Sequence, residues 1–147
     1  MATLTRSITI DAPVDKVFDF ALDIRRLWVA KDVALTDVDI KPEGVGTSAR
    51  IYTHLLGFHL EAGVEYTEVV PGQRIVAKVH WFAEKPTWTF TFEPADGGTK
   101  VTAEGEWNYK VPVVGKPIEA MAVKEHEPFV EEMLANLKTQ VEAKTAA

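Results

Sequence analysis

From residue 34 to residue 110 the sequence follows one pattern, in which apolar and polar side chains alternate. A period of two is typical of β-strands that bury one face and expose the other. Short links interrupt the pattern, among them "KPEGVG", "PGQ", "AEKP" and "ADGG". Links this short join antiparallel neighbours, because a parallel crossover needs about a dozen residues or more. The sequence therefore predicts an antiparallel meander.

Seven strands are expected in all, one of them before the meander. They span residues 4–10, 34–40, 46–56, 58–70, 74–83, 86–94 and 99–110. Between the first and second strands the period changes to that of a helix, with Val14, Val17 and Phe18 on one face. We expect two short helices there. The first would have Asp11 as its N-cap and Pro13 in its first turn.

The chain after "VPVVGKP" is expected to be a long helical segment. Its apolar residues, including Phe129, Met133 and Leu137, fall on one stripe. Pro128 lies within the pattern, so the helix either kinks there or begins again with Pro128 in its first turn. No other predicted element is long enough to cover the apolar face of the sheet. The sequence thus predicts a single α+β domain over residues 1–147, in which the C-terminal helix covers the apolar face of a curved seven-stranded antiparallel sheet.

The inner face of the predicted sheet is rich in aromatic side chains. The two-residue alternation places on it Tyr66, Trp81, Trp88, Phe90, Phe92, Trp107 and Tyr109. Small residues, among them Ala77, Ala103 and Gly105, leave space between these rings. We interpret the combination as a cavity walled by rigid aromatics. The alternative is that the rings simply fill the core.

We predict that this cavity binds a hydrophobic small molecule. Its predicted lining residues are Tyr66, Trp81, Trp88, Phe90, Gly105, Trp107, Tyr109, His126, Phe129 and Met133. Gly105 is included because it removes side-chain bulk where a ligand could lie close to the backbone. The rings of Trp88 and Trp107 are expected to approach each other, because "ADGG" joins their strands as neighbours.

His126 and Tyr109 are the candidate groups for proton transfer. His126 lies four residues after Ala122 and three before Phe129, on the helical stripe that faces the proposed cavity. Its ring could act as a general acid or base, or contact a ligand. It could instead bond a backbone carbonyl that the missing N–H of Pro128 leaves without a donor. The sequence leaves both interpretations open.

Several classes of site are disfavoured by composition and spacing. The chain has no cysteine, which excludes disulfides, thiolate metal sites and cysteine nucleophiles. "HEPFVEE" begins like a zincin motif but has Val130 in place of the second histidine, so no metal is expected. Gly44 and Gly46 in "GVGTSA" resemble a dinucleotide fingerprint. They precede a predicted strand rather than a helix, so we expect a turn and no cofactor.

Charge and hydropathy argue against nucleic acid as a partner and against a membrane-spanning segment. A net charge of −6 argues against a nucleic-acid-binding face, which needs clustered Lys and Arg. No apolar run approaches the roughly 20 residues of a membrane-spanning helix. The start, "MATLTRSITI", lacks a continuous apolar stretch, so no signal peptide is expected and we predict a cytoplasmic protein. The sequence does not determine the oligomeric state.

The segment "ITIDAPVDKVFDFALDIRRLW", followed by a meander and a C-terminal helix, resembles the SRPBCC superfamily of polyketide cyclase/dehydrase, START-like lipid-transfer and pollen-allergen-like proteins. The residues that match the family pattern are Ala12, Pro13, Val17, Phe18, Asp23 and Trp28. The resemblance implies a helix-grip fold, in which the curved antiparallel sheet wraps around the long C-terminal helix, with an apolar pocket between sheet and helix. It does not settle the function, because this scaffold hosts binders, transporters, cyclases and hydrolases.

Two functions fit these observations. The first is a non-catalytic carrier or sensor of a hydrophobic molecule such as a lipid or polyketide. The second is a cofactor-free cyclase, dehydratase or aromatase that acts by positioning and one acid/base group. We favour the binder, because the pocket wall is explicit in the sequence and a convergent set of acid/base residues is not. A third function, an interaction module without a pocket, applies if the inner face is fully packed.

Overall fold

The computed structural model describes residues 2–55, 58–80, 86–107 and 115–146 of the chain. Strands and helices alternate only at the start of the chain, after which strands follow one another up to the last helix. The elements are β1 (Ala2–Ile10), α1 (Val14–Ala21), α2 (Ile24–Leu27), β2 (Ala34–Asp39), β3 (Ser48–Leu55), β4 (Phe58–Val70), β5 (Arg74–His80), β6 (Thr87–Ala95), β7 (Gly98–Trp107) and α3 (Gly115–Ala146).

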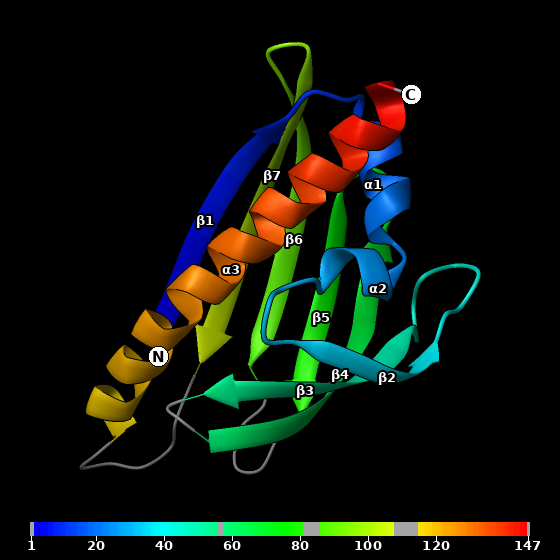
Figure 1. Cartoon of the computed structure of the whole chain (residues 1–147). Helices are drawn as coiled ribbons and strands as arrows, with labels where there is room; N and C mark the ends of the chain where they lie inside the picture. Colours follow the sequence, from blue (N-terminus) through cyan, green and yellow to red (C-terminus); the bar gives the residue numbers. More distant parts are fainter. Residues whose placement is uncertain (1, 56–57, 81–85, 108–114, 147) are drawn as a thin grey trace.

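All seven strands form one antiparallel sheet in the order β1-β7-β6-β5-β4-β3-β2. The strands from β2 to β7 are therefore a meander, as the alternation and the short links predict. In Figure 1, β2 and β3 run across the view while β5, β6 and β7 run along it, so the sheet is strongly curved. Helix α3 lies over its concave side, and α1 and α2 close one end. The predicted helix-grip architecture is confirmed.

Helix α3 packs mainly along β1, the strand at one edge of the sheet (Figure 1). The Lys138 ammonium donates to the carbonyl of Thr9 at 3.0 Å, and Glu142 accepts from the backbone N–H of Asp11 at 2.9 Å. Arg6 forms an ion pair with Glu131 at 3.3 Å. These contacts cover an edge that would otherwise offer unpaired backbone groups to another strand.

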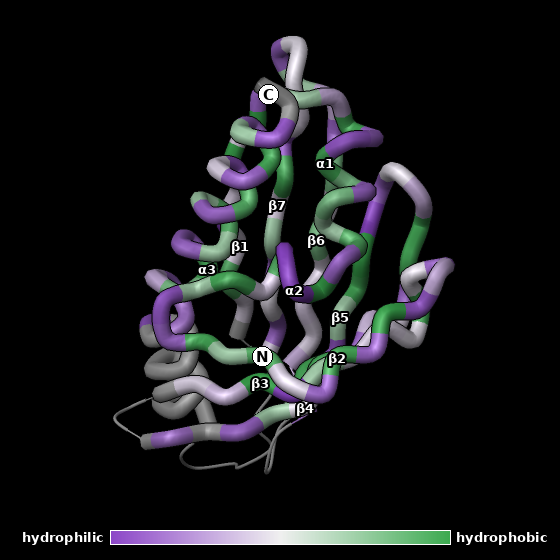
Figure 2. The backbone as a smooth tube through the Cα atoms, turned by 45° about the vertical axis from the view of Figure 1, so that its right-hand side comes forward, coloured by the Kyte–Doolittle hydropathy of each residue, from purple (hydrophilic) through white to green (hydrophobic). Residues whose placement is uncertain are grey.

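The last helix is continuous from Gly115 to Ala146, with Pro128 inside it. Pro128 therefore does not begin a second helix. The tube in Figure 2 alternates between polar and apolar colours along α3, as expected of a helix with one buried stripe. That stripe is buried at Val130, Met133, Leu134, Leu137 and Val141, and these side chains belong to the main core.

The start of α1 differs from the sequence prediction. Its N-cap is Pro13, whose carbonyl accepts hydrogen bonds from the N–H groups of Lys16 and Val17, both at 3.1 Å. Asp11, the predicted N-cap, lies outside the helix with its own N–H bonded to Glu142. The predicted turn around Gly44 and Gly46 is confirmed, since both have φ of +89°.

We expect Leu137→Ala to lower the free energy of unfolding by about 2–5 kcal/mol. Leu137 is fully buried on α3, so the truncation leaves a cavity between the helix and the sheet. Urea denaturation followed by circular dichroism measures the loss. The matched control is Thr139→Ala, an exposed position on the same helix, which should change stability by less than about 0.5 kcal/mol. Equal effects for the two variants would contradict the role of α3 as the cover of the core.

Candidate ligand-binding site

An aromatic cluster joins the concave face of the sheet to α3. We define it by six residues, which are Trp28, Trp88, Phe90, Trp107, His126 and Phe129. The strands β6 and β7 supply three of them, the end of α2 supplies Trp28, and α3 supplies His126 and Phe129. The Trp107 and His126 rings lie 5.0 Å apart between centroids, and those of Trp28 and Phe129 lie 6.4 Å apart. Because α3 runs along β1, these rings span the space between the helix and the central strands.

The two tryptophans of the sheet meet as predicted. Their centroids are 5.4 Å apart and their planes are inclined by 87°, an edge-to-face contact. The register pairs Trp88 with Gly105, so Trp107 is the diagonal neighbour of Trp88 on the same face. His126 lies within 6.4 Å of Trp88 and so contacts both indoles.

The space beside Gly105 is filled by the Trp88 ring. A Cβ atom at position 105 would lie only 2.6–2.8 Å from three carbon atoms of that indole. The expectation of open space for a ligand at Gly105 is therefore wrong, because Trp88 occupies it. A ligand could reach this backbone only if the Trp88 ring moved.

The cluster is closed on the sheet side and accessible on the helix side. Trp107 and Phe90 are each 1% exposed and Trp88 is 3% exposed, so these rings pack against one another. His126 and Phe129 are only half-buried, although both belong to the cluster. The accessible part of the cluster therefore belongs to α3, rather than to the tryptophan wall that the sequence emphasises.

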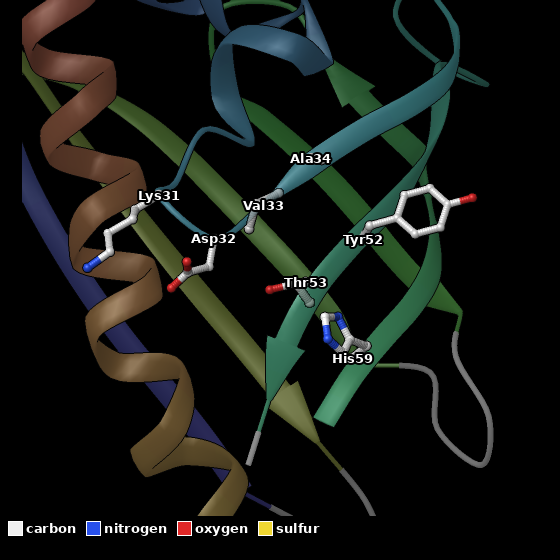
Figure 3. Close-up of a pocket in the computed structure, with 7 residues that line it drawn as sticks. All are labelled: Lys31, Asp32, Val33, Ala34, Tyr52, Thr53 and His59. Carbon is white, nitrogen blue, oxygen red and sulfur yellow. The ribbon is translucent and has the colours of Figure 1, made fainter. Parts of the chain in front are cut away.

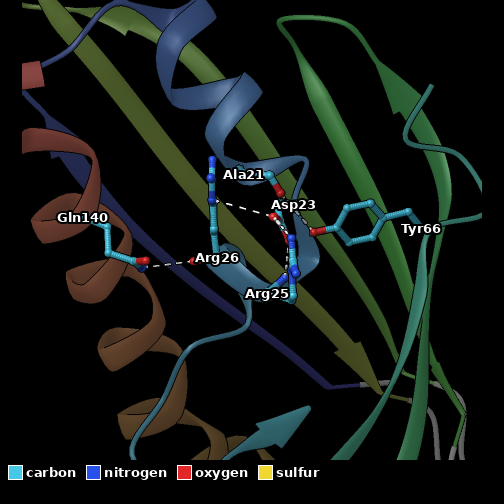
Figure 4. Close-up of polar contacts among 6 residues, drawn as sticks. All are labelled: Ala21, Asp23, Arg25, Arg26, Tyr66 and Gln140. Atoms are coloured by element: carbon cyan, nitrogen blue, oxygen red, sulfur yellow. Dashed lines mark hydrogen bonds and ion pairs between the residues drawn. The ribbon is translucent and has the colours of Figure 1, made fainter. Parts of the chain in front are cut away.

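Tyr66 is fully buried next to this region, and its hydroxyl donates to the carbonyl of Ala21 at 3.1 Å (Figure 4). Burial raises the pKa of the phenol well above its usual range, and the charge of Asp23 raises it further, while the Trp28 side chain opposes the rise. The hydroxyl therefore stays protonated and ties β4 to the end of α1. Met133, another predicted lining residue, is buried in the core.

Trp28 is a member of the cluster that the sequence prediction did not assign to the site. Its ring is 3% exposed and lies edge-on to Phe90, with centroids 6.0 Å apart. Within the described ranges its indole N–H is buried and makes no hydrogen bond of good geometry, but it faces the Tyr66 hydroxyl closely enough to lower the pKa of that phenol. This donor is therefore directed toward Tyr66 in the core. Only the aromatic character and the place of Trp28 in the family pattern signalled it in the sequence.

A pocket of about 370 Å³ opens a few residues beyond Trp28 (Figure 3). It is lined by Lys31, Asp32, Val33, Ala34, Tyr52, Thr53 and His59. Val33 also packs against the core, and the N–H of Lys31 donates to Glu132 of α3. In Figure 3 Lys31 and Asp32 lie toward α3, while Thr53 and His59 lie on the strands opposite. The pocket thus lies between the segment that carries Trp28 and the strands β3 and β4.

Asp23 holds α2, the turn of helix that precedes Trp28 (Figure 4). Its carboxylate accepts from the backbone N–H of Arg25 at 3.0 Å and binds the Arg25 guanidinium at 2.8 Å. The side-chain hydrogen bond from Arg25 lowers the pKa of this carboxyl below its usual range, against the opposing effect of burial. Asp23 therefore caps α2 as a carboxylate and fixes the position from which Trp28 enters the cluster.

The structure brings together Trp88, Phe90, Trp107, His126 and Phe129 of the predicted site. Two predicted members, Trp81 and Tyr109, lie outside the described residues. In the part of the chain that the structure describes, no three His, Asp or Glu side chains gather as metal ligands. No helix there has both the length and the apolar character needed to cross a bilayer.

Residues 1–142 match the model of a family described as polyketide cyclase / dehydrase and lipid transport. The chain therefore belongs to this family. No curated protein matches the sequence significantly.

Solved structures with low sequence identity share the fold. The protein TTHA0849 of Thermus thermophilus has a TM-score of 0.78 at 23% identity, with 97% of this chain and 99% of that chain covered. The protein CV1439 of Chromobacterium violaceum has a TM-score of 0.72 at 19% identity, with the same two coverages. Ara h 8.0201 has a TM-score of 0.67 at 14% identity, with 96% and 97% covered. The helix-grip fold is common to all of them.

We expect Gly105→Ala to destabilise the protein by about 1–3 kcal/mol, because its Cβ would collide with the Trp88 ring. Near-ultraviolet circular dichroism should also change, since the displaced ring alters the Trp88–Trp107 contact. Gly63→Ala is the matched control, because a Cβ on this strand glycine meets no atom within 4 Å. If Gly105→Ala were as stable as Gly63→Ala, the Trp88 ring would not pack directly on the backbone of Gly105.

Asp23→Ala is expected to cost about 0.5–2 kcal/mol at neutral pH, by removing the cap of α2. Folding lowers the pKa of Asp23, so its carboxylate contributes fully to stability above the unfolded-state pKa of about 3.9. That stability is lost as the pH falls through the lower folded-state pKa. The difference in melting temperature from the parent should therefore shrink between about pH 7 and about pH 3. Glu43→Ala, at an exposed position, is the control. If the difference in melting temperature grew as the pH fell, Asp23 would not stabilise α2 as a carboxylate.

Proposed function

We propose that the protein binds a hydrophobic small molecule, such as a lipid or polyketide, against the accessible side of the aromatic cluster. The family description, which includes lipid transport, supports this class of ligand. The bound molecule would lie between α3 and the sheet and contact His126 and Phe129 first. In this proposal the protein acts as a carrier or sensor rather than as an enzyme.

The observation that carries the proposal is the incomplete burial of the two α3 members. Apolar and aromatic side chains that face a core are normally covered, as Trp88 and Trp107 are. His126 and Phe129 belong to the same cluster and keep accessible surface. A flat apolar molecule laid on these rings would complete their burial and gain edge-to-face and stacking contacts.

The pocket of about 370 Å³ between β3, β4 and the segment after Trp28 is consistent with the same proposal. It begins at Lys31, three residues after Trp28 of the aromatic cluster, and Val33 in its wall also packs against the core. Part of an elongated apolar molecule could occupy it, which is consistent with a lipid or a polyketide.

A cofactor-free cyclase or dehydratase is the alternative function. The observation in its favour is that His126, a titratable side chain, lies 5.0 Å from Trp107 inside the cluster. Its imidazole could transfer a proton to or from a bound substrate. Tyr109, the second proposed acid/base group, lies outside the described residues. We favour binding, because one imidazole among aromatic rings does not make a convergent set of catalytic groups.

We expect N-phenyl-1-naphthylamine, an uncharged aromatic probe, to quench tryptophan fluorescence with a Kd on the order of micromolar. Phe129→Ser should weaken this binding about tenfold, because it removes apolar surface from the accessible side of the cluster. The control is Val45→Ser, which changes a half-exposed apolar side chain in the turn between β2 and β3. Thermal melting establishes that each variant is folded.

His126→Ala provides a second variant in case Phe129→Ser fails to fold. It should also weaken the probe, whereas the alternative function predicts in addition the loss of any turnover. If the parent protein shows no quenching at a saturating probe concentration, the cluster is packed core and the proposed function is wrong. Equal binding by the parent and both variants would place the probe elsewhere on the molecule.

A further inference from the structure

A second pocket lies at the C-terminal end of α3, where that helix meets α1 and α2. Its volume is about 580 Å³. The residues that line it are Pro13, Lys16, Asp19, Phe20, Arg26, Val141 and Lys144. None of them belongs to the aromatic cluster, so the two features are built from different residues. The pocket opens between the three helices, outside the concave face of the sheet.

The charge of this pocket is opposite to that of the whole protein. Three of its lining side chains are cationic and one is acidic, whereas the chain carries a net charge of −6. Lys16 and Lys144 are both exposed, and neither forms an ion pair with another described residue. Like charges that face one space repel each other, and a bound anion removes that repulsion. The arrangement therefore favours an anionic occupant.

The floor of the pocket is the ring of Phe20, which is 9% exposed. Two cations lie over this ring, the Arg26 guanidinium at 4.5 Å and the Lys144 ammonium at 5.6 Å from its centroid. These cation–π contacts hold both charged groups beside an apolar surface. Val141 and Pro13 extend that surface. The pocket therefore offers apolar contact and positive charge within one small volume.

Arg26 is oriented so that its outer nitrogens remain available. Its Nε lies 3.7 Å from Asp23, which makes a shorter contact of 2.8 Å with Arg25. In Figure 4 the Arg26 side chain runs alongside α1, with its terminal nitrogens beyond the contact to Asp23. Two parallel N–H groups of a guanidinium match the two oxygens of a carboxylate. No side chain caps the start of α1 at Pro13, so the positive end of that helix adds to the field.

We propose that this pocket binds a small amphiphilic carboxylate. The carboxylate is held by Arg26, Lys16 and Lys144, and the apolar body lies against Phe20, Pro13 and Val141. A carboxylate fits better than a bulkier polyanion, because Asp19 lines the same pocket and Asp23 already shares the charge of Arg26. The site does not depend on the function proposed for the aromatic cluster.

Octanoate is the probe for this site, and 1-octanol is its uncharged counterpart. Titration of isotope-labelled protein with octanoate should shift the backbone amide resonances of α1, α2 and the last turns of α3. The same concentrations of 1-octanol should shift them much less, because the alcohol offers no charge to the three cations. The shifts in α1 and in the last turns of α3 locate the ligand, since the aromatic cluster contains no residue of either segment.

Two double variants, each of which removes two positive charges, distinguish binding in the pocket from an effect of net charge alone. Lys16→Gln with Lys144→Gln removes two cations of the pocket, and octanoate should bind about tenfold more weakly. Lys78→Gln with Lys100→Gln removes two exposed lysines of the sheet and should leave the affinity unchanged. All four positions are exposed, so both proteins should fold, and circular dichroism checks this.

Any one of four results would overturn the proposal. Octanoate could leave the amides of α1, α2 and the end of α3 unshifted. The two double variants could lose affinity equally, which would mean that only net charge matters. Octanol could bind as tightly as octanoate, which would make the pocket an apolar site without a role for the cations. Resonance shifts confined to the surroundings of Trp28 and His126 would assign octanoate to the aromatic cluster instead.

Discussion

The contact between the Trp88 ring and the backbone of Gly105 determines how the concave face is filled. Because position 105 has no Cβ, the indole can lie directly on β7, where its edge meets Trp107. The two rings then form a layer over the strands β6 and β7. Helix α3 packs mainly along β1, to which Lys138 and Glu142 bind it, rather than on the central strands. His126 and Phe129 extend from α3 and contact the rings of Trp107 and Trp28.

Most of the fold could be predicted because its signals are local. The period of two, the length of the links and the helical stripe each depend on neighbouring residues, and the predicted strands agree closely with β1 to β7. The N-cap of α1 could not be predicted in this way. The N–H of Asp11 bonds Glu142, which is 131 residues further along the chain, and Pro13 is left to begin the helix.

The candidate site is harder to predict from the sequence, because it depends on the register between neighbouring strands. That Trp88 and Trp107 lie on neighbouring strands could be inferred from the link "ADGG" between them. That Trp88 lies opposite Gly105, and so fills the space predicted for a ligand, depends on the pairing of individual residues across β6 and β7. The sequence pattern likewise does not indicate that the accessible rings of the cluster belong to α3, or that the buried Trp28 is a member of the cluster.

The single turn of α2 contributes to both proposed sites. Arg26 and Trp28 are two residues apart, and residues with this spacing on a helix do not face each other. Arg26 therefore lies over Phe20 in the basic pocket, while Trp28 lies against Phe90 in the aromatic cluster. So short a helix has little stability of its own. Asp23 caps its start, and Asn136 and Gln140 of α3 donate to the carbonyls of Val29 and Arg26 at 3.0 and 3.2 Å. These bonds, which Figure 4 shows in part, fix one turn of backbone between two sites of opposite chemistry.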